Sequence, residues 1–446
     1  MTGDLAAAVD AALPQVRQDL ERLIRIPSVA FPGFDPAPVR RSAELTAEIL
    51  RATGLDDVRL LDMEGVPPAV LGELAAPDGG PTVLLYAHHD VQPAGDEADW
   101  VSPPFEPEER HGRLFGRGAC DDKVGIVLHQ AALLAHGGRP PVGVKVFVEG
   151  EEEVGSPNLD RFLKRFGDEL GADVIVLADA TNWRIGVPGL TTHLRGLVDC
   201  EVEVRTLDHA VHSGMYGGVF PDALTSLCRL LAGLHDEKGN VAVEGLATWR
   251  ADPLDLTEED LRREMGTVEG LQPIGEGALT ERLWARPSIS VLGIDAPRVK
   301  EAANILVPVA RAKVSLRLAP GQDPDLAMTA LLRHLEASAP WGSEVTVRSG
   351  ASSWPIAVDA HGPVFDAARQ ALKDAWGRDP VDIGSGGAIP FVKAFADAYP
   401  EATVLLWGVE DPDGRAHGAN ESLLLEDFRK NCLAEALLLE RLAQAS

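Results

Sequence analysis

Short, nearly uninterrupted apolar runs recur in the first and last parts of the chain. They lack the alternation of a half-exposed strand, so they predict strands buried on both faces of a mostly parallel α/β sheet that helices cover. The predicted strands are residues 69–74, 82–87, 142–148, 173–177 and 403–407. Apolar positions at helical spacing predict helices over residues 5–25 and 124–135.

The middle of the chain has a different pattern. Residues 193–205 alternate polar and apolar side chains, as a half-exposed strand does. The elements that follow are a helix at 221–235, strands at 288–293 and 309–318, a helix at 324–337 and a strand at 344–348. This β-α-β-β-α-β order is that of a ferredoxin-like sandwich. We therefore expect an inserted α+β domain at 191–350 within an outer domain formed by 1–190 and 351–446.

The composition of the chain indicates a soluble globular protein. A chain of 446 residues suits two or three domains, and its 45% hydrophobic and 25% charged content is that of a soluble globular protein. The net charge of −28 disfavours nucleic acid and anionic membranes as partners, and its ordinary interpretation is a solvated surface. We find neither a signal peptide pattern nor an apolar run long enough to span a bilayer. Four cysteines without metal-site spacing fit reduced thiols in the cytoplasm.

Candidate metal ligands follow several of the predicted strands. His88, His89 and Asp90 close one strand, and side chains alternate along a strand, so His88 and Asp90 share a face. A carboxylate beside a metal-bound imidazole commonly fixes its tautomer. The alternative is a histidine pair that ends a strand without any metal.

Acidic residues follow other strands or turns. Asp121 and Asp122 come after a glycine-containing turn, where an Asp is usually only a helix N-cap. The run 151–153 is Glu-Glu-Glu, which alone would be an exposed acidic loop. It follows a buried strand, however, and loops at the carboxyl ends of parallel strands line ligand crevices. Asp179 and His417 also follow predicted strands.

Together these residues indicate a two-metal hydrolase. His88, Asp179, Glu153 and His417 can be terminal ligands, and Asp121 can bridge the two ions. The negative charges of three carboxylates do not fully balance the positive charges of two divalent cations, so the site has a net positive charge. This charge lowers the pKa of a bridging water and makes it a nucleophile. Nitrogen and oxygen ligands suit Zn²⁺, with Mn²⁺ or Co²⁺ as substitutes.

The chain resembles the cocatalytic zinc peptidases that include carnosinases, bacterial dipeptidases, carboxypeptidase G, aminoacylase and succinyl-diaminopimelate desuccinylase. The segments 86–93 and 112–123 carry the resemblance, which is strongest to the dipeptidase branch. It implies that His88 and Asp179 bind one ion, that Glu153 and His417 bind the other, and that Asp121 bridges. It also implies Glu152 as general base, Asp90 as the residue that braces His88, and a frequently cis Asp121–Asp122 peptide bond.

The inserted domain also resembles this family, as a lid and dimerisation domain. Its counterpart of His212 reaches the partner subunit's active site and would stabilise the oxyanion. Asn304 and Arg317 resemble substrate-binding positions, and a planar guanidinium suits a carboxylate. From the residues alone, a turn histidine, a capping asparagine and a surface arginine are the simpler interpretations.

The sequence departs from the family pattern at 385–390. Ser-Gly-Gly-Ala-Ile-Pro stands where dipeptidases often carry Arg-Glu-Gly-Gly-Ser-Ile-Pro in a loop that contacts the substrate. We still expect Gly386 and Gly387 to contact the substrate through backbone groups, with His361 as a further candidate.

The resulting hypothesis is a homodimeric dinuclear metallopeptidase that cleaves dipeptides or other short amides. A deacylase of N-acyl amino acids with the same fold is the alternative that the altered loop leaves open. A non-catalytic metal-binding protein is an alternative from another class.

Overall fold

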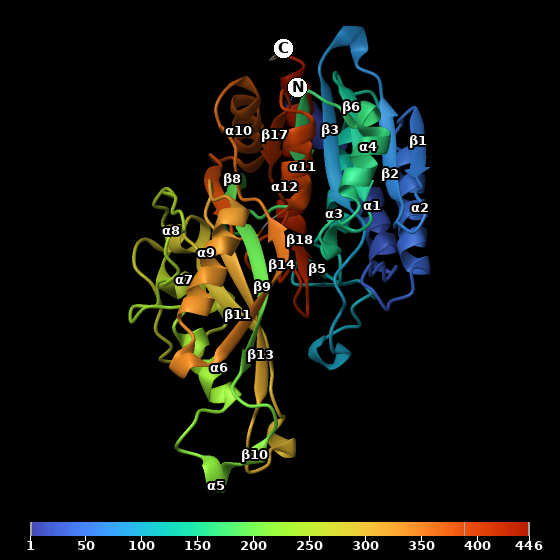
Figure 1. The fold of residues 1–446 in the computed structure, drawn as a ribbon. Coiled ribbons are helices and arrows are strands. Elements are labelled where there is room, and N and C mark those ends of the chain that lie inside the picture. Colours follow the sequence, from blue (N-terminus) through green and yellow to red (C-terminus); the bar gives the residue numbers. More distant parts are fainter. Residues whose placement is uncertain (1, 388, 445–446) are drawn as a thin grey trace. The chain divides into compact units, whose positions relative to one another are not determined.

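The computed structural model describes residues 2–387 and 389–444 and divides the chain into two compact units. Unit 1 comprises Met1–Thr192, Val358–Ile383 and Ile389–Ser446, and unit 2 comprises His193–Ala357 with Gly384–Ala388 (Figure 1). The sequence placed the insertion at 191–350. In the structure, the glycine-containing loop near residue 386 also groups with unit 2.

The large sheet of unit 1 is parallel at its centre and antiparallel at its edges. Its strands, in spatial order, are β1 (Asp57–Leu61), β2 (Ala69–Leu74), β6 (Gly143–Glu149), β3 (Thr82–His88), β7 (Val174–Leu177), β17 (Thr403–Leu406) and β8 (Gly189–Leu194). Strands β6, β3, β7 and β17 run parallel, while β1, β2 and β8 pair antiparallel. The predicted parallel α/β sheet is confirmed for these buried central strands. The antiparallel edges were not predicted.

Helices cover both faces of this sheet. Helices α1 (Thr2–Ile24), α3 (Lys123–Ala135), α10 (Pro363–Trp376) and α12 (Leu425–Leu442) pack together, and α2 (Ala37–Arg51) packs on β1 and β2. Helices α4 (Leu159–Leu170) and α11 (Pro390–Ala398) pack against each other. Aromatic rings join α4 and α11 to the sheet, with Phe147 of β6 close to Phe162, Phe391 and Phe395. The sequence predicted α1 and α3 nearly to their ends.

A small antiparallel sheet joins two distant parts of the chain in unit 1. Its order is β18 (Ser422–Leu424), β5 (Arg113–Phe115) and β4 (Glu108–Arg110). Ser422 pairs with Phe115, so the segment that follows His417 lies beside the segment that precedes Asp121. This pairing brings two candidate ligand loops together.

Unit 2 has the predicted ferredoxin-like order. Its antiparallel sheet runs β11 (Ser288–Asp295), β13 (Val309–Leu318), β9 (Gly196–Arg205) and β14 (Glu344–Ser353), and α6 (Ala223–Ala232) and α9 (Pro324–Ala337) pack on it. Helices α7 (Glu258–Met265) and α8 (Leu279–Trp284) lie between α6 and β11 in sequence. The short elements β10 (Val211–His212), α5 (Ser213–Tyr216) and β12 (Ile305–Leu306) belong to unit 2, whereas β15 (Ile356–Ala357) and β16 (Val381–Ser385) pair with β8 of the large sheet.

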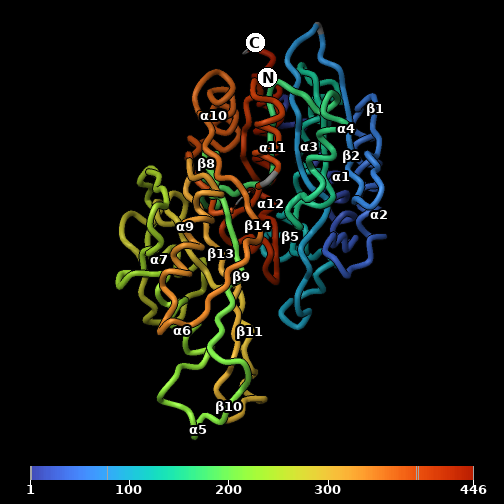
Figure 2. Tube along the Cα trace, in the orientation of Figure 1, coloured from blue at the N-terminus to red at the C-terminus, as the bar shows by residue number. Residues whose placement is uncertain are grey.

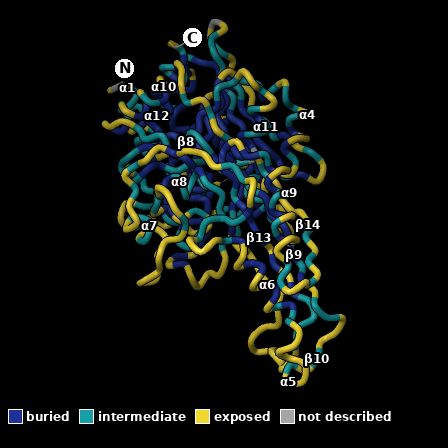
Figure 3. The backbone as a smooth tube through the Cα atoms, turned by 60° about the vertical axis from the view of Figure 1, so that its left-hand side comes forward, coloured by how far each residue is buried: buried dark blue, intermediate teal, exposed yellow. Residues whose placement is uncertain are grey.

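One end of unit 2 is unusually exposed. Strand β10 and helix α5 lie at this end (Figure 2), and the tube there is drawn mostly in the colour of exposed residues (Figure 3). Met215, Val219 and Phe220 are each at least 70% exposed. Across the described part of the chain, the helices lack the combination of length and apolarity that crossing a membrane requires.

Candidate metal centre

His88 ends strand β3 of unit 1 and is fully buried. Its Nε2 lies 3.1 Å from Oδ1 of Asp121 and 4.0 Å from Oδ2 of Asp179. The other ring nitrogen, Nδ1, lies 3.1 Å from the carbonyl oxygen of Asp90 and 3.5 Å from its Oδ1. Asp90 therefore orients the imidazole so that Nε2 faces the two acids.

Asp121 lies between two imidazoles. Its Oδ1 faces His88, and its Oδ2 lies 3.0 Å from Nε2 of His417. The same nitrogen of His417 lies 3.2 Å from Oε2 of Glu153. The peptide bond between Asp121 and Asp122 is cis, and Asp122 caps helix α3 by accepting a hydrogen bond from the Gly125 amide. One carboxylate with an oxygen toward each histidine is the arrangement expected of a bridging ligand.

The potential ligand atoms form three overlapping groups, each within 4.8 Å. The groups are His88 with Glu152 and Asp179, Asp121 with Glu153 and His417, and Asp121 with Asp179 and Glu410. All five residues expected to bind metal are thus brought together, His88 from the end of β3 and the other four from loops. Glu410 is a member that the sequence analysis missed. It lies four positions after the end of β17. Like several of the predicted ligands, it could therefore have been identified as an acidic residue that follows a strand.

The electrostatics of the cluster fit divalent cations. Burial, together with nearby negative charge from Asp121 and Glu153, raises the pKa of Asp179 to about 7. Burial also opposes ionisation of Asp121, but hydrogen bonds with His417 and His88 outweigh it and hold the Asp121 pKa well below its usual value. Hydrogen bonds to Asp121 and Glu153 raise the pKa of His417 to about 11. Divalent ions would compensate the carboxylates while binding neutral imidazoles, so these residues fit a metal cofactor.

The three consecutive glutamates have three different environments. Glu151 accepts hydrogen bonds from the backbone N of Asn158 at 2.9 Å and from its Nδ2 at 3.0 Å. Glu152 groups with His88, and Glu153 with His417. The Asp90 carboxylate accepts the backbone N–H groups of Glu152 at 3.2 Å and Glu153 at 3.1 Å, which fixes this loop. The alternative of an exposed acidic loop is therefore wrong.

Glu152 has the environment of a proton-transfer group. Burial raises its pKa well above the usual value, and the negative charges of Asp179 and Asp90 add to this effect, while the charge of His88 opposes it. A carboxylate whose proton affinity is raised in this way is better suited to accept a proton than an ordinary glutamate.

A buried ion pair joins the two ligand loops. Arg117 is 1% exposed and Glu421 is 0% exposed, and Nη1 of the arginine donates to Oε2 of the glutamate at 2.6 Å. Glu421 also accepts the backbone N–H groups of Gly118, Cys120 and Asp121 at 3.1, 2.9 and 3.2 Å. Nη2 of Arg117 donates to the carbonyl oxygen of His417 at 3.2 Å. The pair thus holds the backbones of both Asp121 and His417.

This ion pair gives a stability prediction. Replacing Arg117 by Met would leave the buried Glu421 charge unpaired, so we expect about 3–5 kcal/mol lower free energy of unfolding. Glu421→Gln should lower the free energy of unfolding less. It should weaken metal binding about 10- to 100-fold, which is typical when a residue that positions a metal ligand is replaced. Denaturant unfolding and metal titration measure the two effects. Arg429→Met, which breaks the exposed pair with Asp10, is the matched control.

The candidate residues of unit 2 lie at two places within that unit. His212 is exposed and its Nδ1 accepts the Gly214 amide at 3.0 Å, which makes it the cap of helix α5. Asn304 lies near it, because its carbonyl oxygen accepts the Ser213 amide at 3.0 Å. Arg317 lies on β13, and Gly386 lies beside Arg195.

His361 is part of unit 1, and the structure gives it a single partner among the described residues. Its side chain is 91% exposed, with Nδ1 2.7 Å from Oδ1 of Asp359. The metal-ligand groups do not include it.

A protein-family model and several known proteins match this chain. The model of peptidase family M20/M25/M40 matches residues 84–441. The chain is 35% identical to a cysteinylglycine-S-conjugate dipeptidase of Corynebacterium striatum, over 87% of this chain and 86% of that protein. It is 30% identical to a β-Ala-His dipeptidase of Rattus norvegicus, over 92% and 85%.

Solved structures give the same result for the fold. The di-peptidase Dug1p of Saccharomyces cerevisiae superposes with a TM-score of 0.86 at 25% identity, over 100% of this chain and 99% of that chain. Human carnosine dipeptidase 1 superposes with a TM-score of 0.85 at 26% identity, over 99% of both chains.

Proposed function

Because the chain belongs to peptidase family M20/M25/M40, we propose that it is a metal-dependent dipeptidase. The observation that carries this proposal is the position of Asp121 between the two imidazoles, with Glu152 beside them. The names of the relatives support dipeptides as substrates. They do not favour the deacylase or the non-catalytic alternative.

We propose two Zn²⁺ ions per subunit, for which Mn²⁺ or Co²⁺ can substitute. His88 and Asp179 would hold one ion, Glu153 and His417 the other, and Asp121 would contact both. Bound there, the ions would supply Lewis acidity and lower the pKa of a coordinated water. The mixed nitrogen and oxygen donor set supports zinc.

Glu152 is the general acid–base in this mechanism. It takes a proton from the attacking water and later gives it to the leaving amine. Its raised pKa supports both steps. Asp90 keeps His88 in one orientation and, through two backbone N–H groups, fixes the loop that carries Glu152.

Residues of unit 2 bind the substrate in this proposal. The guanidinium of Arg317 binds the carboxylate at the end of the dipeptide, and Asn304 and the backbone of Gly386 and Gly387 contribute further contacts. His212 stabilises the developing oxyanion. His361 stays a prediction, and its exposed position lends it no support.

A substrate panel tests the proposed function. Metal-loaded protein should hydrolyse dipeptides, including Cys-Gly and β-Ala-His, much faster than N-acetyl or N-succinyl amino acids. The reverse order would favour the deacylase, and no hydrolysis with either zinc or manganese would favour a binding protein. Metal analysis of the same samples should give two ions per chain.

We also propose a homodimer formed through unit 2 and a cytoplasmic location. The exposed apolar side chains of the end that carries β10 and α5 support an interface. The four cysteines are all free thiols, which supports a reducing compartment.

If His212 acts in the partner subunit's site, two inactive variants should complement each other. Chains carrying His212→Ala and chains carrying Glu152→Gln would each form inactive homodimers, whereas a mixed dimer would contain one complete site. We therefore expect partial recovery of activity after the two are mixed and re-equilibrated. If mixed dimers form but activity does not recover, His212 does not act in the active site of the partner subunit.

A further inference from the structure

Two half-buried guanidiniums in unit 2 have no acidic partner among the described residues. Arg195 precedes strand β9, and Arg317 lies on strand β13. By contrast, Arg113 lies 2.8 Å from Asp411, and the buried Arg117 lies 2.6 Å from Glu421. A desolvated positive charge without a counter-ion is costly, so such a pair is expected where an external anion binds.

The hydrogen bonds of Arg195 leave one edge of its guanidinium without a partner among the described residues. Nη1 donates to Oγ of Ser288 at 2.9 Å and to the carbonyl oxygen of Arg286 at 3.5 Å. Nε is buried and has no hydrogen-bond partner within the described part of the chain. Nε and Nη2 form the side of a guanidinium that can bind both oxygens of a carboxylate.

Gly386 lies at this edge. A β-carbon added to Gly386 would stand 2.8 Å from Nη2 of Arg195 and 3.6 Å from its Nε. A larger residue would therefore crowd Nη2 at this edge, and glycine avoids that contact. This gives a physical reason for glycine in the loop that the sequence analysis singled out.

Arg317 adds a second positive charge close by. It pairs with Leu197 of β9 and with Ser288 of β11, the residue whose hydroxyl Arg195 binds. Burial lowers the pKa of Arg195 to about 10, and the charge of Arg317 contributes to this shift. Burial also lowers the pKa of Arg317. Two neighbouring cations that repel each other can both be compensated by two carboxylates.

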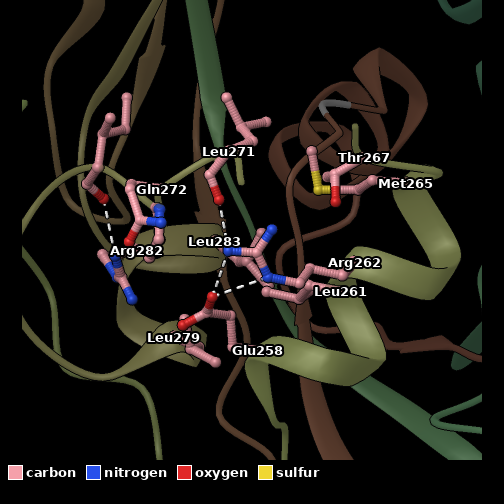
Figure 4. A pocket seen from close by; sticks show the side chains of 12 residues that line it. Glu258, Leu261, Arg262, Met265, Thr267, Leu271, Gln272, Leu279, Arg282 and Leu283 are labelled. Atoms are coloured by element: carbon pink, nitrogen blue, oxygen red, sulfur yellow. Dashed lines mark hydrogen bonds and ion pairs between the residues drawn. The ribbon is translucent and has the colours of Figure 1, made fainter. Parts of the chain in front are cut away.

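An arginine in a cavity of unit 2, Arg262, already has an acidic partner. This cavity of about 400 Å³ is lined by helices α7 and α8 and the segment between them (Figure 4). There, Nε of Arg262 donates to Glu258 at 2.8 Å, and Nη1 of Arg282 donates to the carbonyl oxygen of Ile274 at 2.7 Å. Arg262 thus already has a carboxylate, and among the described residues the cavity offers one arginine without an acidic partner, Arg282, whereas Arg195 and Arg317 are two.

We propose that Arg195 and Arg317 form a subsite for two carboxylates, with Gly386 at its edge, and that the peptidase prefers dipeptides with an acidic C-terminal residue. Arg317 binds the main-chain carboxylate, and the Nε–Nη2 edge of Arg195 binds the carboxylate of the Asp or Glu side chain. This inference rests on the proposed dipeptidase function. The net charge of −28 otherwise disfavours anionic substrates, so local positive charge is required for such a preference.

The test compares Ala-Asp with Ala-Asn, which differ in one charge at nearly equal size. Wild-type protein should show a kcat/KM for Ala-Asp about tenfold or more above that for Ala-Asn. Arg195→Met should remove this ratio, because the side-chain carboxylate loses its partner. Arg311→Met is the matched control, since it removes one positive charge from the same strand as Arg317 at an exposed pair with Glu203. The control should keep the wild-type ratio.

A wild-type ratio near one, or a ratio that Arg195→Met leaves unchanged, would overturn the inference. Binding of the product amino acids separates this outcome from failure of the proposed function. Calorimetry should show tighter binding of aspartate than of asparagine, again by about tenfold, and only with Arg195 present. Equal binding in wild-type protein would exclude the subsite, whether or not any dipeptide is hydrolysed.

A second pair of variants tests the edge of Arg195 without removing the arginine. Gly386→Ala should lower the Ala-Asp to Ala-Asn ratio, because the new methyl group would crowd Nη2. Gly387→Ala is the same change one residue later, where the nearest atom is Oγ of Ser385 at 3.6 Å, and it should keep the ratio. Equal loss of the ratio in both variants would mean that the loop, and not the guanidinium edge, determines the preference.

Discussion

Replacing Glu152 by Gln is expected to lower kcat about 10²- to 10⁴-fold while both metal ions stay bound. Glutamine has nearly the same shape as glutamate, but it cannot take a proton from water or return one to the leaving amine. Single-turnover kinetics and metal analysis of the same preparation measure the two quantities. KM should change little, because the substitution leaves the contacts proposed for the substrate in place.

Glu151 provides a matched control for this experiment. It is the adjacent residue and also a buried glutamate, but its carboxylate is held by Asn158. Glu151→Gln should therefore keep most of the activity. If Glu152→Gln lost an ion as well as activity, Glu152 would be a ligand of the group that it forms with His88 and Asp179, and its role as the base would need revision.

Replacing Asp121 by Asn is expected to reduce the bound metal by at least one ion per chain and to lower kcat/KM more than about 100-fold. The expected effect exceeds the 10- to 100-fold typical of residues that only support a ligand, because Asp121 faces both imidazoles directly. Asparagine would keep one oxygen but place an amide N–H group toward one of the histidines. Metal analysis after dialysis, together with steady-state kinetics, measures both effects.

Asp411→Asn is the comparison variant for Asp121→Asn. Asp411 is also buried and lies in the loop between β17 and His417, but its carboxylate is bound by Arg113. We expect the metal content of this variant to match that of the wild type. Two ions per chain in the Asp121→Asn protein would argue against a bridging role for Asp121.

The sequence predicted the features that depend on local pattern. Continuous apolar runs identified β2, β3, β6, β7 and β17, because a strand buried on both faces needs apolar side chains at every position. The antiparallel edge strands carried less information, since burial there is partial and β1 has exposed or intermediate positions along most of its length. Strand β14 extends five residues beyond its predicted end through Ser and Gly residues that show no apolar alternation.

The residues of the candidate site also divide into those that the sequence predicted and those that it did not. His88, Asp121 and His417 follow strands or tight turns, so their positions in the chain predicted their convergence. Glu410 was not predicted although it also follows a strand, and Glu421 was not predicted because its importance depends on which distant loop it meets. From the sequence alone, Glu421 resembles an ordinary surface acid. Its role is visible only in the structure, where β18 pairs with β5 and Glu421 contacts Arg117.

The difference between Glu151 and Glu152 also required tertiary structure. Three identical neighbours cannot be distinguished by composition, and their assigned roles came from the family resemblance. The structure supplies a physical reason, because Asn158 binds the first carboxylate while the Asp90 carboxylate fixes the backbone of the next two residues. The association of Gly386 with Arg195 was likewise not predictable, since it joins two residues of unit 2 that lie far apart in the chain.

The pairing of β18 with β5 has a consequence for biosynthesis. Strand β5 leaves the ribosome well before β18 and the histidine that precedes it. Earlier segments can begin to fold as they appear, since folding during synthesis proceeds from the N-terminus. The nascent polypeptide nevertheless lacks the complete set of candidate ligands until His417 has been synthesised, so a centre built from these residues could take up all of its ions only after that point.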